Sequence, residues 1–248
     1  MHSPGHSDCS PTFPVGNFIN PIILNPNSIT KYVEKVPIPQ ILKPDKIEKI
    51  YSPETKTEVV QSYYTISIRQ ITHKFHPQIP PTQIWLYCGP DGPGETNPMI
   101  ITKQYNPTVI KWQNELPSQH LLSVYIDPTV HGAGFPAPEV RCASHLHGGI
   151  QAPTSDGEPT DWTTPGQYKI YYYPALERSS STLFWHDHAM GITRLNVYAG
   201  LIGGVYLVQD PKLEAKLNLP TGPYEIPLVI SDKTFDIDGQ LVYSISNS

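Results

Sequence analysis

Proline is the feature that most constrains the fold of this chain. The 248 residues include 28 prolines, which are spread along the whole length rather than gathered in one tract. Proline lacks a backbone N–H and its ring clashes with the preceding helical turn, so long helices are excluded over most of the sequence. The 15 tyrosines and the short apolar runs between turn residues favour strands instead. The sequence therefore predicts an all-β domain with many loops.

Charge and apolar content exclude several classes of protein. The net charge is −5, the pI is about 6.0 and no basic run is present, so we expect no nucleic-acid partner. No stretch of about 20 apolar residues and no classical signal peptide is visible, so we expect no membrane partner. The odd set of three cysteines, Cys9, Cys88 and Cys142, has no disulfide spacing and favours a reducing, cytoplasmic compartment.

The distribution of proline and polar residues divides the chain into four parts. Residues 1–28 are expected to be a disordered lead-in, and residues 29–61 an extended N-terminal arm. Residues 62–211 are expected to form the β-domain. Residues 212–248 are interpreted as a linker followed by one or two strands of an incomplete second domain. Because a two-strand stub is not stable alone, the polypeptide is expected to be truncated.

Alternating apolar residues indicate where the strands lie. The pattern is clearest over 62–71, where Tyr64, Ile66 and Ile68 fall on one face. Further strands are expected within 83–87, 99–103, 108–114, 140–149, 166–174, 181–190 and 200–210. Residues 116–139 form a long connection, and 189–200 a short helix or turn. About eight short strands separated by turn signals are typical of a β-sandwich or Greek-key barrel.

Two His-x-His pairs carry the strongest chemical signal. His145 and His147 lie in "HLHGG", and His186 and His188 lie in "WHDH". Residues i and i+2 of a strand point to the same face, about 6–7 Å apart. If the two strands are neighbours, four imidazoles meet on one patch. Such a patch suits copper, zinc, iron or nickel, and a set without carboxylates favours copper, which heads the divalent affinity series.

The alternatives to a metal patch remain open at this point. Each pair also fits two ordinary strand residues, and the isolated histidines are given no functional role; these are His2, His6, His73, His76, His120 and His131. Cys142 and Asp187 have the opposite strand parity to the paired histidines, which excludes them as ligands. Asp187 is interpreted as a carboxylate that supports the site.

The residues around the pairs resemble a known family. "HLHGG" and "TLFWHDHAMGITRLNVYAGLIGGVYLV" are similar to the first cupredoxin domain of multicopper oxidases, nearest the spore-coat laccase and bilirubin oxidase branch. "YVEKVPIPQILKP", "IPPTQIWLY" and "YEIPLVISDKTFDIDGQLVY" extend the resemblance over about residues 30–248, into the start of a second cupredoxin domain. The resemblance implies a cupredoxin-like fold, association with a coat, and oxidation of phenol-like or other small reductants by dioxygen.

The resemblance also implies the cofactor and the site residues. These oxidases reduce dioxygen to water at a trinuclear cluster of one type 2 and two type 3 coppers, half of whose ligands come from the first domain. By position, His145 resembles the type 2 ligand, and His147, His186 and His188 the type 3 ligands. Asp156, in "TSDG", resembles the catalytic acid that assists proton delivery. An aspartate that only caps a surface turn is the other interpretation.

The chain departs from the family pattern in one respect. It has no third His-x-His pair and no cysteine flanked by histidines that could hold type 1 copper. We therefore expect this chain alone to be inactive and to require a C-terminal cupredoxin portion. The alternative is a non-catalytic copper-binding or structural coat protein with the same fold.

Overall fold

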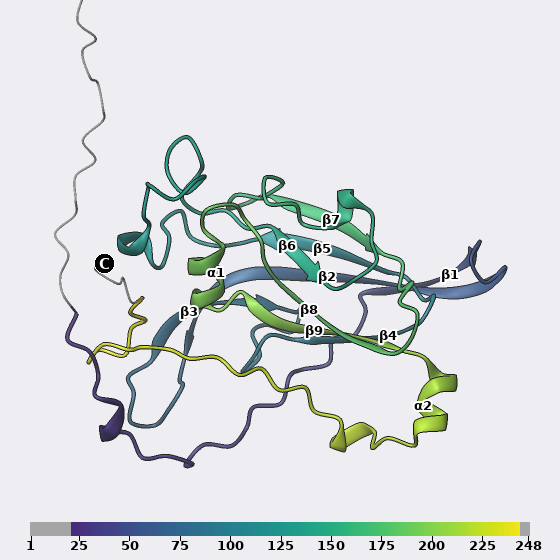
Figure 1. Ribbon diagram of the computed structural model, residues 1–248, viewed down its shortest axis with the longest axis horizontal. Helices are drawn as coiled ribbons and strands as arrows, with labels where there is room; N and C mark the ends of the chain where they lie inside the picture. Colours follow the sequence, from purple (N-terminus) through teal and green to yellow (C-terminus); the bar gives the residue numbers. More distant parts are fainter. Residues whose placement is uncertain (1–20, 244–248) are drawn as a thin grey trace, which may run out of the picture.

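The structure, a computed structural model, describes residues 21–243. Within that range two β-sheets pack face to face, as predicted for an all-β domain (Figure 1). The strands are β1 (Lys46–Ser52), β2 (Thr57–His73), β3 (Thr82–Cys88), β4 (Met99–Lys103), β5 (Thr108–Asn114), β6 (Ser144–His147), β7 (Tyr168–Tyr173), β8 (Ser181–Asp187) and β9 (Ile202–Gln209). The helices are α1 (Thr193–Ala199) and α2 (Pro211–Leu217), with 3-10 turns η1 (Pro26–Ser28), η2 (Ser123–Tyr125), η3 (Pro153–Ser155) and η4 (Gly222–Tyr224).

The first sheet is built around the long strand β2. Its order is β1-β2-β5-β7, and β3 also pairs with β2. β2 runs antiparallel to β1 and β3 but parallel to β5. Tyr64, Ile66 and Ile68 are buried on its inner face, as the alternation predicted.

The second sheet has the order β4-β9-β8-β6 and carries both histidine pairs. β8 and β9 are antiparallel, and β6 forms the edge by pairing with β8. The strand ladder shifts register between Trp185 and His186. β6 is only four residues long, and all four of its residues pair with β8.

Large aromatic side chains fill the space between the sheets. The Trp185 ring is 5.6 Å from that of Trp112, and Trp112 is 5.5 Å from Tyr87, all centroid to centroid and edge to face. Edge-to-face pairs of this kind add about 0.5–1.5 kcal/mol each to area burial. Trp185 lies opposite Gly204 of β9, where the missing side chain makes room for the indole.

The N-terminal arm expected over 29–61 is wrong in its second half. Residues 46–52 and 57–61 belong to the β1–β2 hairpin, which projects at the right of Figure 1. Residues 21–45 do run mostly without regular structure, along the lower side of that view. Pro37, Pro39 and Pro44 precede residue 46, and Pro53 lies in the turn between β1 and β2, so no proline interrupts a strand of the hairpin. Residues 21–28, in the part of the chain expected to be a disordered or loosely draped lead-in, hold η1 and a β-bridge from Ile23 to Asp236. The expectations for residues 1–20, including His2, His6 and Cys9, lie outside the described residues.

The C-terminal part differs from the expected linker and strands. α2 and η4 lie in the expected linker, and residues 226–243 contain isolated bridges but no strand. Residues 233–243 pack on α1 instead. The Tyr198 hydroxyl donates to the carbonyl of Val242 at 2.8 Å and accepts the N–H of Thr234 at 2.7 Å. This segment is therefore attached to the β-domain by hydrogen bonds.

The long connection 116–139 is fixed by a buried histidine. His120 Nδ1 accepts the N–H of Leu122 at 2.9 Å, so its Nε2–H donates to Asn196 Oδ1 at 2.8 Å. The ring also packs on Trp85 at 4.4 Å. Both ring nitrogens are satisfied inside the protein, and the residue acts as an anchor.

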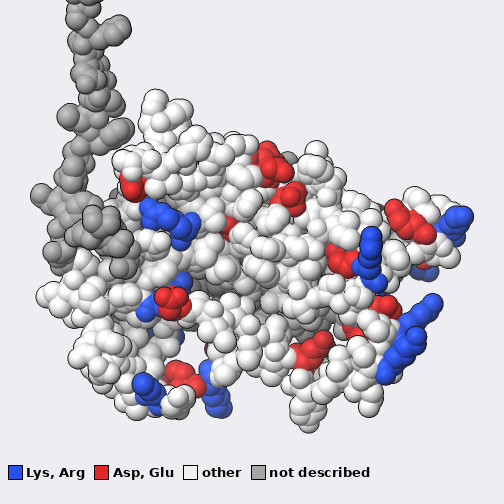
Figure 2. All heavy atoms as spheres, viewed as in Figure 1, with Lys and Arg blue, Asp and Glu red and all other residues white. Residues whose placement is uncertain are grey.

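Surface features give little indication of a partner. Acidic and basic side chains are interspersed on the face shown in Figure 2. None of the helices between residues 21 and 243 is long and apolar enough to cross a bilayer. Cys88 and Cys142 are buried free thiols.

We predict that Gly204→Ala destabilises the domain by about 1–3 kcal/mol, the usual cost of overpacking a core. A Cβ at this position would lie 1.9 Å from Trp185 Nε1, and the indole is fully buried and cannot move aside. Urea unfolding measures the change. Gly94→Ala is the control, because its Cβ would come no nearer than 3.2 Å to another atom. Equal effects of the two substitutions would contradict the prediction.

Candidate metal centre

The strands β6 and β8 place the histidines by simple alternation. Leu146 of β6 and Trp185 of β8 are buried in the core. Side chains alternate along a strand, so the residues next to them, His145 and His147 on β6 and His186 on β8, face outward. His145 is paired directly opposite His186 in the antiparallel ladder. The two His-x-His segments are therefore neighbours, as the sequence analysis required.

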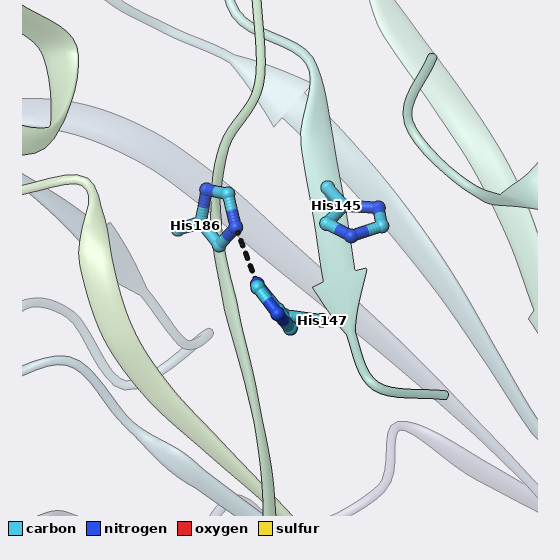
Figure 3. A group of neighbouring side chains, drawn as sticks. All are labelled: His145, His147 and His186. Carbon is cyan, nitrogen blue, oxygen red and sulfur yellow. Dashed lines mark hydrogen bonds between the residues drawn. The ribbon is translucent and has the colours of Figure 1, made fainter. Parts of the chain in front are cut away.

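Three of the four rings come together on the outer face of the sheet. One nitrogen each from His145, His147 and His186 lies within 4.8 Å of the other two (Figure 3). His147 Nδ1 and His186 Nε2 are 3.2 Å apart. Nitrogens at this separation from two strands form a group that can surround one cation or two adjacent cations.

His188 lies next to this group but outside it. β8 ends at Asp187, and the His188 ring stacks on that of His145 with centroids 4.8 Å apart. Its centroid is 5.8 Å from that of His186. The His188 Nδ1 atom is buried and has no hydrogen-bond partner within the described residues.

Main-chain carbonyls determine the tautomers of two rings. His145 Nδ1 lies 2.5 Å from the carbonyl oxygen of Asp156, and His186 Nδ1 lies 2.7 Å from that of Asp187. A carbonyl only accepts, so each Nδ1 carries the proton and each Nε2 presents a lone pair. Burial lowers the pKa of His186, and its backbone hydrogen bond opposes that shift. This is the arrangement usual for imidazole metal ligands.

Asp156 lies behind His145 at the C-terminal end of η3. Its carboxylate Oδ1 is 3.4 Å from His145 Nδ1, while the shorter contact to that nitrogen comes from its main-chain carbonyl. Gln151 Nε2 donates to this Oδ1 at 2.5 Å and to the carbonyl of Leu146 at 3.0 Å. Gln151 thus ties the loop containing Asp156 to β6.

Gly157 is required where this loop passes β6. Its φ is +71°, and a Cβ there would lie 2.3 Å from the carbonyl oxygen of Ser144. The sequence analysis missed both Gly157 and Gln151 as contributors to the site. "SDG" is only a turn signal, and nothing in the sequence marks Gln151.

Asp187 lies between two of the histidines but faces the opposite way. It is fully buried, and its carboxylate accepts the N–H groups of Ala143 at 3.0 Å and Ala189 at 3.1 Å. Burial raises the pKa of this carboxyl to about 6, although the two backbone N–H bonds act in the other direction. Cys142 is likewise buried, on the inner side of the sheet. Neither residue belongs to the imidazole group, in agreement with its strand parity.

Comparison with known proteins identifies similar sequences, although no family model matches this chain. It is 40% identical over 226 residues to a laccase of Bacillus subtilis strain 168, an alignment that covers 87% of this chain and 40% of the laccase. A laccase of Haloferax volcanii is 35% identical over 231 residues, covering 87% of this chain and 37% of that protein. The chain thus spans about two fifths of the length of these relatives.

Solved structures show the same fold. A multicopper oxidase of Pediococcus acidilactici superimposes with a TM-score of 0.62 at 24% identity, over 85% of this chain and 37% of that one. The McoA multicopper oxidase of Aquifex aeolicus gives a TM-score of 0.59 at 25% identity, over 85% and 38% of the two chains. The two-sheet architecture is therefore cupredoxin-like, and the sequence belongs to the multicopper oxidase family.

Proposed function

We propose that His145, His147, His186 and His188 hold copper and form one side of a trinuclear centre that reduces dioxygen to water. The electrons would come from phenol-like or other small reductants. In this assignment His145 is the type 2 ligand, and the other three histidines are type 3 ligands. One observation carries the proposal: nitrogens of three histidines from two paired strands lie within 4.8 Å of one another.

The residues present fit copper in their chemistry. The group offers only imidazole nitrogens, and it includes no carboxylate or thiolate. Main-chain carbonyls hold the ring protons of two histidines on Nδ1, which leaves a lone pair on each Nε2, that of His186 facing His147 Nδ1 at 3.2 Å. The buried Nδ1 of His188 has no partner within residues 21–243. Imidazole sets suit copper, and family membership selects copper over zinc, iron or nickel.

The chain's own residues have separate roles in this proposal. Bound copper would supply one-electron transfer to dioxygen. The main-chain carbonyls of Asp156 and Asp187 hold the ring protons of His145 and His186 on Nδ1. The Asp156 carboxylate, oriented by Gln151 Nε2, is the group that delivers protons to reduced oxygen.

Catalysis by this proposal needs more ligands than these 248 residues contain. The sequence has one set of four paired histidines and no cysteine flanked by histidines. We propose that the remaining copper ligands, including the type 1 centre, come from a C-terminal cupredoxin portion. The longer relatives, of which this chain spans about 40%, support that proposal.

Copper binding tests the ligand assignment directly. The purified chain is expected to retain copper after dialysis, and the double variant His147→Ala/His186→Ala to lose it, because two of the three converging nitrogens are removed. Elemental analysis gives copper per chain. His131→Ala is the control, since this exposed histidine lies in the 116–139 connection, and its copper content should equal that of the wild type. Wild-type chain without copper would support the structural coat protein.

Substitutions at two adjacent positions of the loop behind His145 should affect copper binding differently. Asp156→Asn is expected to keep the copper content, because the main-chain carbonyl that contacts His145 is unchanged. Gly157→Ala is expected to weaken copper binding by about 10–100-fold, because its Cβ forces the loop away from β6. Chelator competition measures both. A stronger loss of affinity in Asp156→Asn would assign its carboxylate to the metal instead of to proton delivery.

The isolated chain is expected to show no turnover. Copper-loaded protein mixed with a phenol should consume no dioxygen above the rate of free copper at equal concentration, since only half of the proposed ligands are present. An oxygen electrode measures the rate. Sustained uptake that is lost in His147→Ala/His186→Ala would refute the requirement for a C-terminal portion.

A further inference from the structure

The position of β6 raises the question of what holds it. The strand has four residues and forms the edge of the second sheet, where β8 is its neighbour. A four-residue pairing at a sheet edge is weak by itself. Two of the three converging histidines, His145 and His147, belong to this strand. Their distance from His186 therefore depends on groups that fix β6 from outside the ladder.

Asp187 supplies such a group at the start of β6. Its Oδ1 accepts the N–H of Ala143, the residue immediately before the strand, at 3.0 Å. The carbonyl of the same Ala143 accepts the N–H of His188 at 2.8 Å. Ala143 is thus bonded on both sides of its backbone to the end of β8. The second oxygen, Oδ2, accepts the N–H of Ala189 at 3.1 Å and fixes the chain beyond His188.

Within the described residues, the nearby buried guanidinium of Arg141 does not form an ion pair with the carboxylate of Asp187. The Arg141 side chain is fully buried, but its guanidinium donates to main-chain carbonyls, including those of Gly132 and Met190. The oxygens of Asp187 therefore bind the two backbone N–H groups, with a further contact from the Asn196 side chain. Hydrogen bonds from backbone N–H to a carboxylate are stronger than neutral ones.

We propose that Asp187 is a positioning residue that sets the separation of the two histidine pairs by fastening Ala143 and Ala189 to the end of β8. It does this from the core side of the sheet while the imidazoles lie on the outer side. The metal-binding consequence rests on the proposed function; the fastening of β6 does not.

The test compares Asp187→Asn with Thr82→Val. The asparagine keeps the shape and one acceptor but turns an NH2 group toward the second backbone N–H. Thr82→Val also preserves shape and removes one buried bond, from Thr82 Oγ1 to the carbonyl of Gly239 at 2.6 Å, but in the other sheet. Comparing the two variants separates the general effect of losing a buried hydrogen bond from the specific effect of losing the bond between Asp187 and the backbone.

The first measurement needs no metal. Amide hydrogen exchange by NMR on copper-free protein should show β6 exchanging at least about tenfold faster in Asp187→Asn than in Thr82→Val, relative to β5. Equal relative rates would overturn the proposal. In the wild type, the Ala143 amide should be as protected as the β8 amides. If the Ala143 amide of the wild type exchanges as fast as loop amides, the proposal is overturned as well. This measurement uses the wild type alone, so it holds even if Asp187→Asn does not fold.

The second measurement uses Cu²⁺ alone. Chelator competition should show affinity about 10–100-fold lower in Asp187→Asn, with an altered copper EPR spectrum, and neither change in Thr82→Val. Unchanged affinity and spectrum in Asp187→Asn would overturn the positioning role. If the wild type binds no Cu²⁺, the proposed function fails, and the exchange data alone decide whether Asp187 fastens β6.

Discussion

The antiparallel register between β6 and β8 is the constraint on which the candidate site depends. With His145 opposite His186, three imidazoles share the outer face while Leu146 and Trp185 fill the core. A slip of one residue would turn every side chain of β6 to the other face and bury the histidines against the aromatic cluster. The indole of Trp185 occupies the space that Gly204 leaves free, which fixes β8 against β9 and so fixes the strand on which β6 pairs. Core packing and site geometry are thus specified by the same few residues.

Much of this arrangement could be predicted from local pattern. Strict alternation gave β2 and the pairing of histidines on one face, and proline excluded long helices. Parity correctly separated His186 from Asp187, because side-chain direction in a strand depends only on odd or even position. The pairing of β6 with β8 could be expected only from the family resemblance. His147 and His186 are 39 positions apart, and the chain between them carries no signal for which strands pair.

Other features depend on tertiary contacts that no local pattern encodes. The β1–β2 hairpin could not be predicted from the sequence, because "KIEKIYS" follows a proline-rich arm and lacks a clear apolar face. Residues 226–243 have the composition of strands but form no strand, and they bond instead to Tyr198, to residues 22–24 and to the start of β3. Gln151 and Gly157 contribute through long-range geometry: one bridges a loop to β6, and the other allows close approach to Ser144. His188 lies past the end of β8 and stacks on His145, a position that strand alternation alone does not predict.

The histidines sit on the outward side of a sheet whose inward side is already packed. In small zinc domains the ion supplies the folding energy, and the apo-protein is unfolded. Here the hydrophobic interior lies on the opposite surface of β6 and β8, and His147 is open to solvent. Under the proposed function, folding and metallation are consequently separable events: the polypeptide would complete its interior first and acquire an ion afterwards, by ligand exchange at an accessible surface, without reopening the structure.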